Sequence, residues 1–212
     1  MRRRGRAEAL RCPGCRLHHH LCLCAELPVV PTRTRVVLVL HQQEEHRSSN
    51  TGRLALRCLP NSVVVAHGRL DPSAALARPL VTAPPYPWQT APESCVVLSP
   101  RDDARPIETW SHRPALTLIV PDGTWRQVAR ARLRLPGLVD LPSAFVAEGP
   151  PLYSLRHDPR PDRLGTLEAL SRALGAIEGP AVREPLDRIL RLLFERTRRM
   201  RGHAAARSEP HH

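Results

Sequence analysis

Short, continuous apolar runs are the feature that most restricts how this chain can fold. Residues 36–40 are all Val or Leu, and similar runs occupy 62–66, 95–98 and 115–120. Apolar runs of this kind, without polar alternation, are typical of parallel strands that are buried on both faces. A shorter run at 138–141 is a fifth candidate strand.

Helical patterns lie between and after these runs, at 51–58, 125–135, 166–177 and 185–200. In the last two, apolar residues recur at spacings of three and four, which places them on one face of a helix. Strands that alternate with helices predict a layered α/β domain.

Prolines and composition divide the rest of the chain. The proline-rich stretches 67–94 and 142–163 are expected to be long loops, and loops of that length are commonly functional. We expect a Cys/His/Arg-rich segment over 1–34, one α/β domain over 35–202 and a disordered tail over 203–212.

The positive charge gathers at the two ends of the chain. The formal net charge is +12, and all 32 basic residues are arginines. Eight arginines lie within 1–35 and eight within 183–207, whereas the long middle is almost balanced. A domain this basic is expected to meet a polyanion, and a solvated basic surface is the alternative.

Other patterns are missing from the sequence. No apolar stretch approaches a membrane span, and the arginine-rich start is not followed by the apolar core of a secretory signal. We therefore expect a cytoplasmic protein with reduced cysteines and no membrane partner. The glycine-rich fingerprints of Rossmann and P-loop sites are also missing, which disfavours both classes.

Four cysteines near the start are spaced C-x2-C-x6-C-x-C, at Cys12, Cys15, Cys22 and Cys24. Zn²⁺ takes four thiolates in a tetrahedron, and a segment this short needs a bound ion to stabilise its fold. The spacing predicts a structural, non-catalytic zinc site. One of the histidines at 18–20 could replace a cysteine as ligand, and four unliganded thiols are the alternative.

The sequence Pro121-Asp122-Gly123-Thr124-Trp125 joins the fourth apolar run to the next helix. Asp122 is therefore expected at the carboxyl end of a strand, where α/β sheets bind ligands. Gly123 permits a tight turn and Thr124 can cap the helix. The motif indicates a ligand site, although turn and cap chemistry with a core Trp125 would also explain it.

Two further groups of polar residues are candidates. His41-Gln42-Gln43-Glu44 follows the first strand, and Asn-Thr-Gly-Arg at 50–53 comes next, where Asn and Thr can also be simple helix caps. Thr166 is expected to cap the helix that it opens. Tyr153 and Arg156 lie in a proline-rich loop that gives them no evident structural role.

Together these motifs resemble the DTW-domain tRNA-uridine aminocarboxypropyltransferase family, named for the residues that are here Asp122, Thr124 and Trp125. The likeness runs from Cys12 to Ile177. It comprises, in the family's order, the four-cysteine pattern, H-x-x-E with N-T-G-R, D-G-T-W, Y-x-x-R and L-x-T-x-E-A.

The chain departs from the family pattern in two places. Gln42 stands where a proline often follows the histidine. Leu98-Ser99-Pro100 lacks the aromatic residue that often precedes this proline, which changes the expected adenosine pocket.

The resemblance implies a fold and a reaction. The expected fold is a SPOUT-like α/β sheet with helices on both faces and a C-terminal trefoil knot that binds S-adenosylmethionine. The expected reaction transfers the 3-amino-3-carboxypropyl group to N3 of a uridine in the variable loop of tRNA and releases 5′-methylthioadenosine. No protein partner is implied.

The resemblance also implies residue roles. Asp122 would act as the base, hold the amino group of S-adenosylmethionine or orient the uracil, and Trp125 or Tyr153 would stack on that base. A helix N-terminus would lower the pKa of Asp122, whereas burial against Trp125 would raise it. Either Arg53 or Arg156 would bind the cofactor carboxylate or a phosphate. The expected catalytic residues are Asp122, Thr124 and Trp125. The residues expected to bind the cofactor are Ser99, Pro100, Asp122, Thr166 and Glu168. The residues expected to bind the substrate are Asn50, Thr51, Arg53, Tyr153 and Arg156.

Two other functions compete with this one. A SPOUT-type RNA methyltransferase would use the same cofactor but release S-adenosylhomocysteine. A non-enzymatic zinc-ribbon RNA-binding protein would not bind S-adenosylmethionine.

Overall fold

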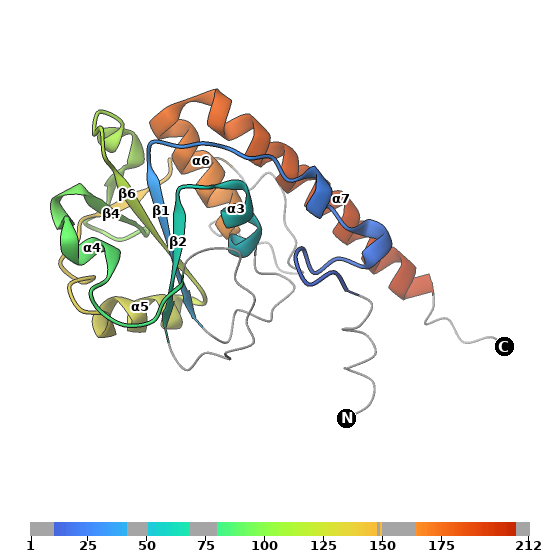
Figure 1. Cartoon of the computed structure of the whole chain (residues 1–212), viewed down its shortest axis with the longest axis horizontal. Coiled ribbons are helices and arrows are strands. Elements are labelled where there is room, and N and C mark those ends of the chain that lie inside the picture. The colour runs from blue at the N-terminus through green and yellow to red at the C-terminus, as the bar shows by residue number, and fades with distance from the viewer. Residues whose placement is uncertain (1–10, 42–50, 68–79, 148, 150–163, 207–212) are drawn as a thin grey trace.

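The computed structural model describes residues 11–41, 51–67, 80–147, 149 and 164–206 (Figure 1). Its centre is a seven-stranded sheet of order β3-β2-β1-β6-β4-β7-β5, in which neighbouring strands pair in parallel. The strands are β1 (Arg35–His41), β2 (Ser62–His67), β3 (Leu80–Val81), β4 (Cys95–Leu98), β5 (Arg105–Pro106), β6 (Thr117–Asp122) and β7 (Ser143–Phe145).

The predicted fifth strand at 138–141 is wrong, because β7 begins only at Ser143. The apolar run that suggested it lies in the turn after α5, where Leu138 and Leu141 are buried against the sheet. Burial without strand pairing therefore produced the same apolar signal. The four longer apolar runs do form strands.

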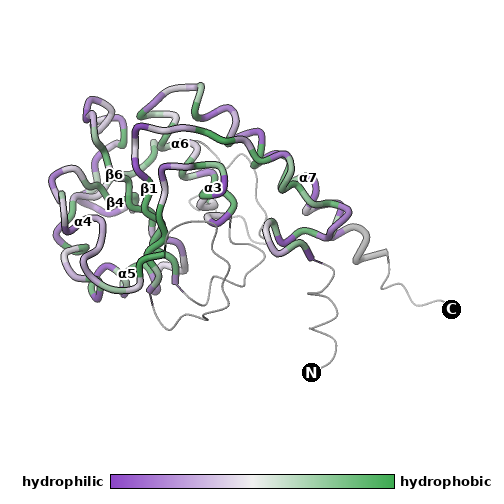
Figure 2. Tube along the Cα trace, in the orientation of Figure 1, coloured by the Kyte–Doolittle hydropathy of each residue, from purple (hydrophilic) through white to green (hydrophobic). Residues whose placement is uncertain are grey.

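Helices cover both faces of the sheet, as predicted. The side chains of Val37 and Val39 pack with α5 on one face, and those of Leu38 and Leu40 pack with α3 and α6 on the other. Figure 2 shows the most hydrophobic residues in the strands between these layers. The helices are α3 (Gly52–Cys58), α4 (Pro87–Thr90), α5 (Trp125–Arg134), α6 (Thr166–Glu178) and α7 (Pro180–Ala206), with short 3-10 helices η1 (His19–Leu21), η2 (Cys24–Glu26), η3 (Pro92–Ser94) and η4 (Ile107–Trp110).

The last helix differs from the prediction at both ends. It starts at Pro180 and takes Pro185 into its body, whereas the proline was expected to open the helix. It also continues to Ala206, so residues 203–206 of the expected tail are helical, and 207–212 lie outside the described residues. No helix in the described part of the chain is long and apolar enough to cross a membrane.

The centre of the sheet contains a change of direction. Strands β1 and β6 are neighbours, with Leu40 opposite Asp122. The helix after β1 is α3, on one face, whereas the helix after β6 is α5, on the other. When the connections leave two adjacent strands toward opposite faces, a crevice opens at their carboxyl ends, and such crevices bind ligands. The expected C-terminal knot stays a prediction, and residues 150–163, which precede α6, lie outside the described residues.

Helices α6 and α7 cross closely at a glycine. Gly179, with φ of 94°, ends α6 and lets the chain turn back into α7. A Cβ placed on Gly175 would lie 2.8 Å from both Cβ and Cδ of Arg183 in α7. The missing side chain of Gly175 therefore permits the two helices to pack together.

We predict that Gly175→Ala destabilises the protein by about 1–2 kcal/mol, because the clash with α7 outweighs the gain in helix propensity of about 1 kcal/mol. Urea unfolding of both proteins measures the difference. The control is Ala169→Gly in the same helix, which should lose only the propensity difference of about 1 kcal/mol. A more stable Gly175→Ala protein would show that the crossing is loose.

Candidate active site and four-cysteine centre

Asp122 lies at the carboxyl end of β6, as predicted, and contacts the start of α6. The hydroxyl of Thr166 donates a hydrogen bond of 2.9 Å to Oδ1 of Asp122. Thr166 is the first residue of α6, and Gly165 occupies the cap position. The prediction that Thr166 caps this helix is therefore wrong, since its hydroxyl binds the carboxylate instead.

The start of α3 meets the same carboxylate. A Cβ on Gly52 would lie 2.6 Å from Oδ2 of Asp122 and 3.2 Å from Cγ2 of Thr166, so only glycine allows this approach. Thr51 makes no side-chain cap for its own helix. Its hydroxyl instead accepts the N–H of Leu167 at 3.1 Å, which satisfies a free donor at the start of α6. Three segments distant in sequence thus converge on Asp122.

The turn after Asp122 is built as expected. Gly123 has φ of 159°, and a Cβ there would lie 2.9 Å from Oε1 of Gln127. Thr124 caps α5 in a reciprocal arrangement, because its hydroxyl accepts the N–H of Gln127 and its own N–H donates to Oε1 of Gln127 at 2.7 Å. Trp125 is 47% exposed, so the alternative that it belongs to the core is wrong.

A pair of histidines extends this edge of the sheet. His41 and His67 are opposite each other at the ends of β1 and β2, with ring centroids 5.8 Å apart and nearly perpendicular planes. Burial lowers the pKa of His67, and the neighbouring His41 and Arg134 act in the same direction. Nδ1 of His41 lies 3.3 Å from Nε2 of Gln127. Sequence reasoning missed His67 and Gln127. The position of His67 at the end of an apolar run, and of Gln127 three residues after the helix cap Thr124, could have identified them.

The remaining candidates are spread over the edge of the sheet. Ser99 is buried just after β4 and donates its N–H to the carbonyl of Ala144, while Pro100 is exposed. Glu168 is only 1% exposed and forms an ion pair with Arg172 at 2.7 Å. Arg53 is half-buried in the first turn of α3. The predicted residues Asn50, Tyr153 and Arg156 lie outside the described residues.

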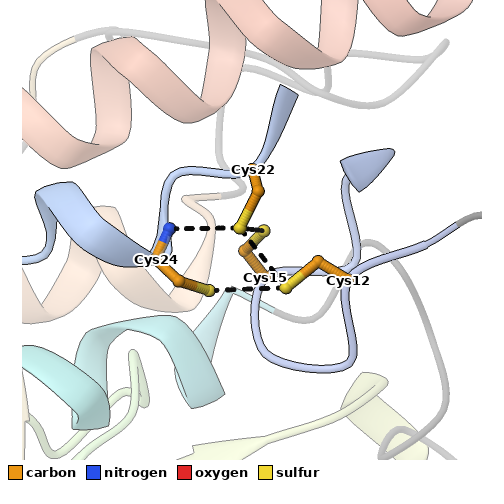
Figure 3. A group of neighbouring side chains, drawn as sticks. All are labelled: Cys12, Cys15, Cys22 and Cys24. Carbon is orange, nitrogen blue, oxygen red and sulfur yellow. Dashed lines mark hydrogen bonds between the residues drawn. The ribbon is translucent and has the colours of Figure 1, made fainter. Parts of the chain in front are cut away.

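The four cysteines form a second centre, beside α3 (Figure 3). All six cysteines of the chain are free thiols, and these four sulfurs lie within 4.8 Å of one another. The Cys12–Cys22, Cys12–Cys24 and Cys15–Cys22 pairs have sulfur separations of 3.4, 3.6 and 3.7 Å. A tetrahedral ion with metal–sulfur bonds of about 2.3 Å requires separations of about 3.8 Å. The donor set therefore fits a metal ion.

The thiols of this centre cannot all ionise by themselves. Burial opposes ionisation of Cys12, but hydrogen bonds from the Cys15 backbone and the neighbouring thiols lower its pKa to about 6. Burial raises the pKa of Cys24 to about 12, against a hydrogen bond of 2.8 Å that Arg57 donates to its sulfur. The pKa of Cys12 is thus lowered, whereas burial raises the pKa values of Cys15 and Cys24, so four thiolates at neutral pH require a cation.

The described parts of the two basic ends, from residue 11 onward and up to residue 206, lie side by side. Figure 1 shows the N-terminal segment along the C-terminal half of α7. Arg196 of α7 donates to the carbonyl of Cys22 at 2.7 Å and pairs with Glu26, and Arg11 contacts Met200. The helix also presents exposed arginines to solvent, at Arg188, Arg191, Arg198, Arg199 and Arg201.

The fold and the site define an α/β protein with Asp122 at the carboxyl ends of its central strands and a cysteine cluster beside α3. The chain belongs to the DTW domain family, whose profile matches residues 9–198. The tRNA-uridine aminocarboxypropyltransferase 2 of Drosophila melanogaster is 31% identical over 193 residues, covering 86% of this chain and 73% of that protein. The tRNA-uridine aminocarboxypropyltransferase A of Arabidopsis thaliana is 29% identical over 195 residues, covering 79% of this chain and 72% of that protein. No solved structure matches.

Proposed function

We propose that this protein transfers the 3-amino-3-carboxypropyl group of S-adenosylmethionine to N3 of a uridine in the variable loop of tRNA. The names of its relatives support a tRNA-uridine substrate and this transferred group. The observation that carries the proposal is Asp122 of the D-G-T-W sequence, which lies at the end of β6 where the starts of α3 and α6 converge. The parallel sheet, with β6 inserted between β1 and β4, is compatible with the proposed SPOUT-like knot.

Asp122 is the proposed base. Its carboxylate takes the N3 proton, and the N3 electron pair forms a bond to the methylene carbon attached to sulfur. The carbon–sulfur bond breaks, its electron pair neutralises the sulfonium, and 5′-methylthioadenosine leaves. The Thr166 hydroxyl fixes the carboxylate through Oδ1. The same carboxylate is suited to bind the ammonium group of the transferred moiety, which is the competing role for Asp122.

The other proposed roles belong to residues near the carboxyl ends of the strands. Thr124 caps α5 and so presents Trp125, whose exposed ring is suited to stack on the uracil. Arg53, in the first turn of α3, is proposed to bind the cofactor carboxylate or an RNA phosphate. We retain the family roles of the other sites as proposals: Ser99, Pro100 and Glu168 for the cofactor, and Asn50, Thr51, Tyr153 and Arg156 for the substrate.

We propose Zn²⁺ as the ion of the four-cysteine centre. Four thiolates form a closed tetrahedral set that leaves no open position for a substrate, so the ion stabilises the fold and takes no part in the reaction. Zn²⁺ would supply the positive charge that lets all four cysteines ionise.

The zinc proposal predicts about one equivalent of zinc in protein purified without added metal, measured by elemental analysis. Substitution of Cys24 by Ser should release the metal, whereas Cys95→Ser, a buried cysteine of β4, should retain it. Less than about a tenth of an equivalent in the parent protein, with four reactive thiols, would contradict a zinc site.

The basic surface predicts salt-dependent tRNA binding. Each phosphate contact contributes about 0.7–0.9 to the slope of log affinity against log salt concentration. Deletion of residues 1–8 and replacement of Arg191, Arg198, Arg199 and Arg201 by Gln should therefore flatten this slope, measured by filter binding at several salt concentrations.

The control for that experiment removes charge elsewhere. Arg101 and Arg105 are exposed at the β5 edge of the sheet, and their replacement by Gln should leave the slope nearly unchanged. The same flattening per charge removed in both sets of variants would mean that binding responds only to net charge.

The proposed base predicts that Asp122→Asn lowers single-turnover transfer from labelled S-adenosylmethionine to tRNA by about 10²–10⁴-fold. The amide is nearly isosteric and can still accept the Thr166 hydrogen bond, so thermal melting should not change. Cofactor affinity should also be unchanged. Lost cofactor binding would assign Asp122 to the ammonium group, and near-parental transfer would remove it from the active site.

A further inference from the structure

Gln127 connects the D-G-T-W turn to His41. Its Oε1 accepts the backbone N–H of Thr124 at 2.7 Å, and its Nε2 lies 3.3 Å from Nδ1 of His41. A backbone N–H can only donate, so the amide oxygen must face Thr124 and the amide nitrogen must face His41. The orientation of this amide is therefore fixed by the helix cap.

The fixed amide decides which ring nitrogen of His41 carries a proton. The NH₂ group of Gln127 can only donate, so Nδ1 of His41 must accept and carries no proton. The ring proton is then on Nε2, and His41 is a neutral N–H donor. A second proton on Nδ1 would point at the NH₂ group and break the contact.

The position of His41 relates it to Asp122. Leu40 is opposite Asp122 in the sheet, so the Cα atoms of His41 and Asp122 are about 6 Å apart, given strands about 4.8 Å apart and a rise of about 3.3 Å. Asp122 contacts α6 on one face, and His41 contacts α5 on the other. The two side chains therefore lie on opposite faces of the sheet at the same carboxyl edge, where a ligand bound over the strand ends can meet both.

We infer that Nε2–H of His41 donates a hydrogen bond to a carbonyl oxygen of the substrate pyrimidine, next to the reacting nitrogen, and that Gln127 is the positioning residue that holds His41 in this tautomer. This inference rests on the proposed function. When N3 of a uracil loses its proton, negative charge spreads to the oxygens on both sides, and a preorganised N–H donor stabilises it. A neutral donor does so without repelling the cationic sulfonium.

The tautomer can be tested without substrate, by ¹⁵N NMR of the histidine side chains. The resonances of His41, assigned by its loss in His41→Asn, should show an unprotonated Nδ1 and a protonated Nε2. Gln127→Glu keeps the cap, because its carboxylate still accepts the Thr124 N–H, but it presents an acceptor to Nδ1 and should bring a proton there. A protonated Nδ1 in the parent protein would overturn the inference.

The substrate contact is tested by two matched variants. The amide nitrogen of Gln can reach the place of Nε2, whereas that of Asn is close to the place of Nδ1. We expect His41→Asn to lower the rate of single-turnover transfer to tRNA by about 10²–10³-fold, which is the usual loss when one hydrogen-bond donor to a developing oxyanion is removed. The rate of His41→Gln should be at least about tenfold higher than that of His41→Asn. Melting temperature and S-adenosylmethionine affinity should be unchanged in both.

The outcomes separate the inference from the proposed function. Equal transfer by the two His41 variants, whether high or low, would overturn the substrate contact while the parent enzyme remains active. A parent protein that transfers nothing to tRNA would overturn the proposed function and the contact together, and the NMR result would then decide the tautomer alone.

Discussion

The hydrogen bond from Thr166 to Asp122 is the interaction on which the rest of the site depends. It ties the end of β6 to the start of α6, and Gly52 lets α3 approach the same carboxylate. Thr51 completes the junction by accepting an N–H of α6. A carboxylate held between two helix starts is fixed in position before any ligand arrives, and such preorganisation is the main physical source of catalysis in enzymes.

The D-G-T-W sequence organises both faces of the sheet at this edge. Asp122 contacts α6 on one face of the sheet, while Thr124 caps α5 and orients Gln127 toward His41 on the other. The four-cysteine centre is linked to this region through Arg57, which lies in α3 and donates to Cys24. A bound metal there would hold the N-terminal segment against the helix whose first residue contacts Asp122.

The sequence predicted the features that depend only on residues close together in the chain, such as strands and the cysteine cluster. Apolar runs located four strands, and the spacing of Cys12 to Cys24 predicted a cluster that the structure confirms. Prediction from neighbouring residues failed where a side chain bonds to a residue far away in the sequence, as the hydroxyls of Thr51 and Thr166 do. It also failed at 138–141, since burial in a turn and burial in a strand leave the same apolar pattern.

The central claim is the identity of the transferred group, and mass spectrometry of the products tests it most directly. The protein would be incubated with tRNA and S-adenosylmethionine, and the digested nucleosides and the adenosine by-product would be analysed together. The account predicts a 3-amino-3-carboxypropyl uridine and an equal amount of 5′-methylthioadenosine. A methylated uridine with S-adenosylhomocysteine would contradict it and establish a methyltransferase, and unmodified tRNA would leave only an RNA-binding protein.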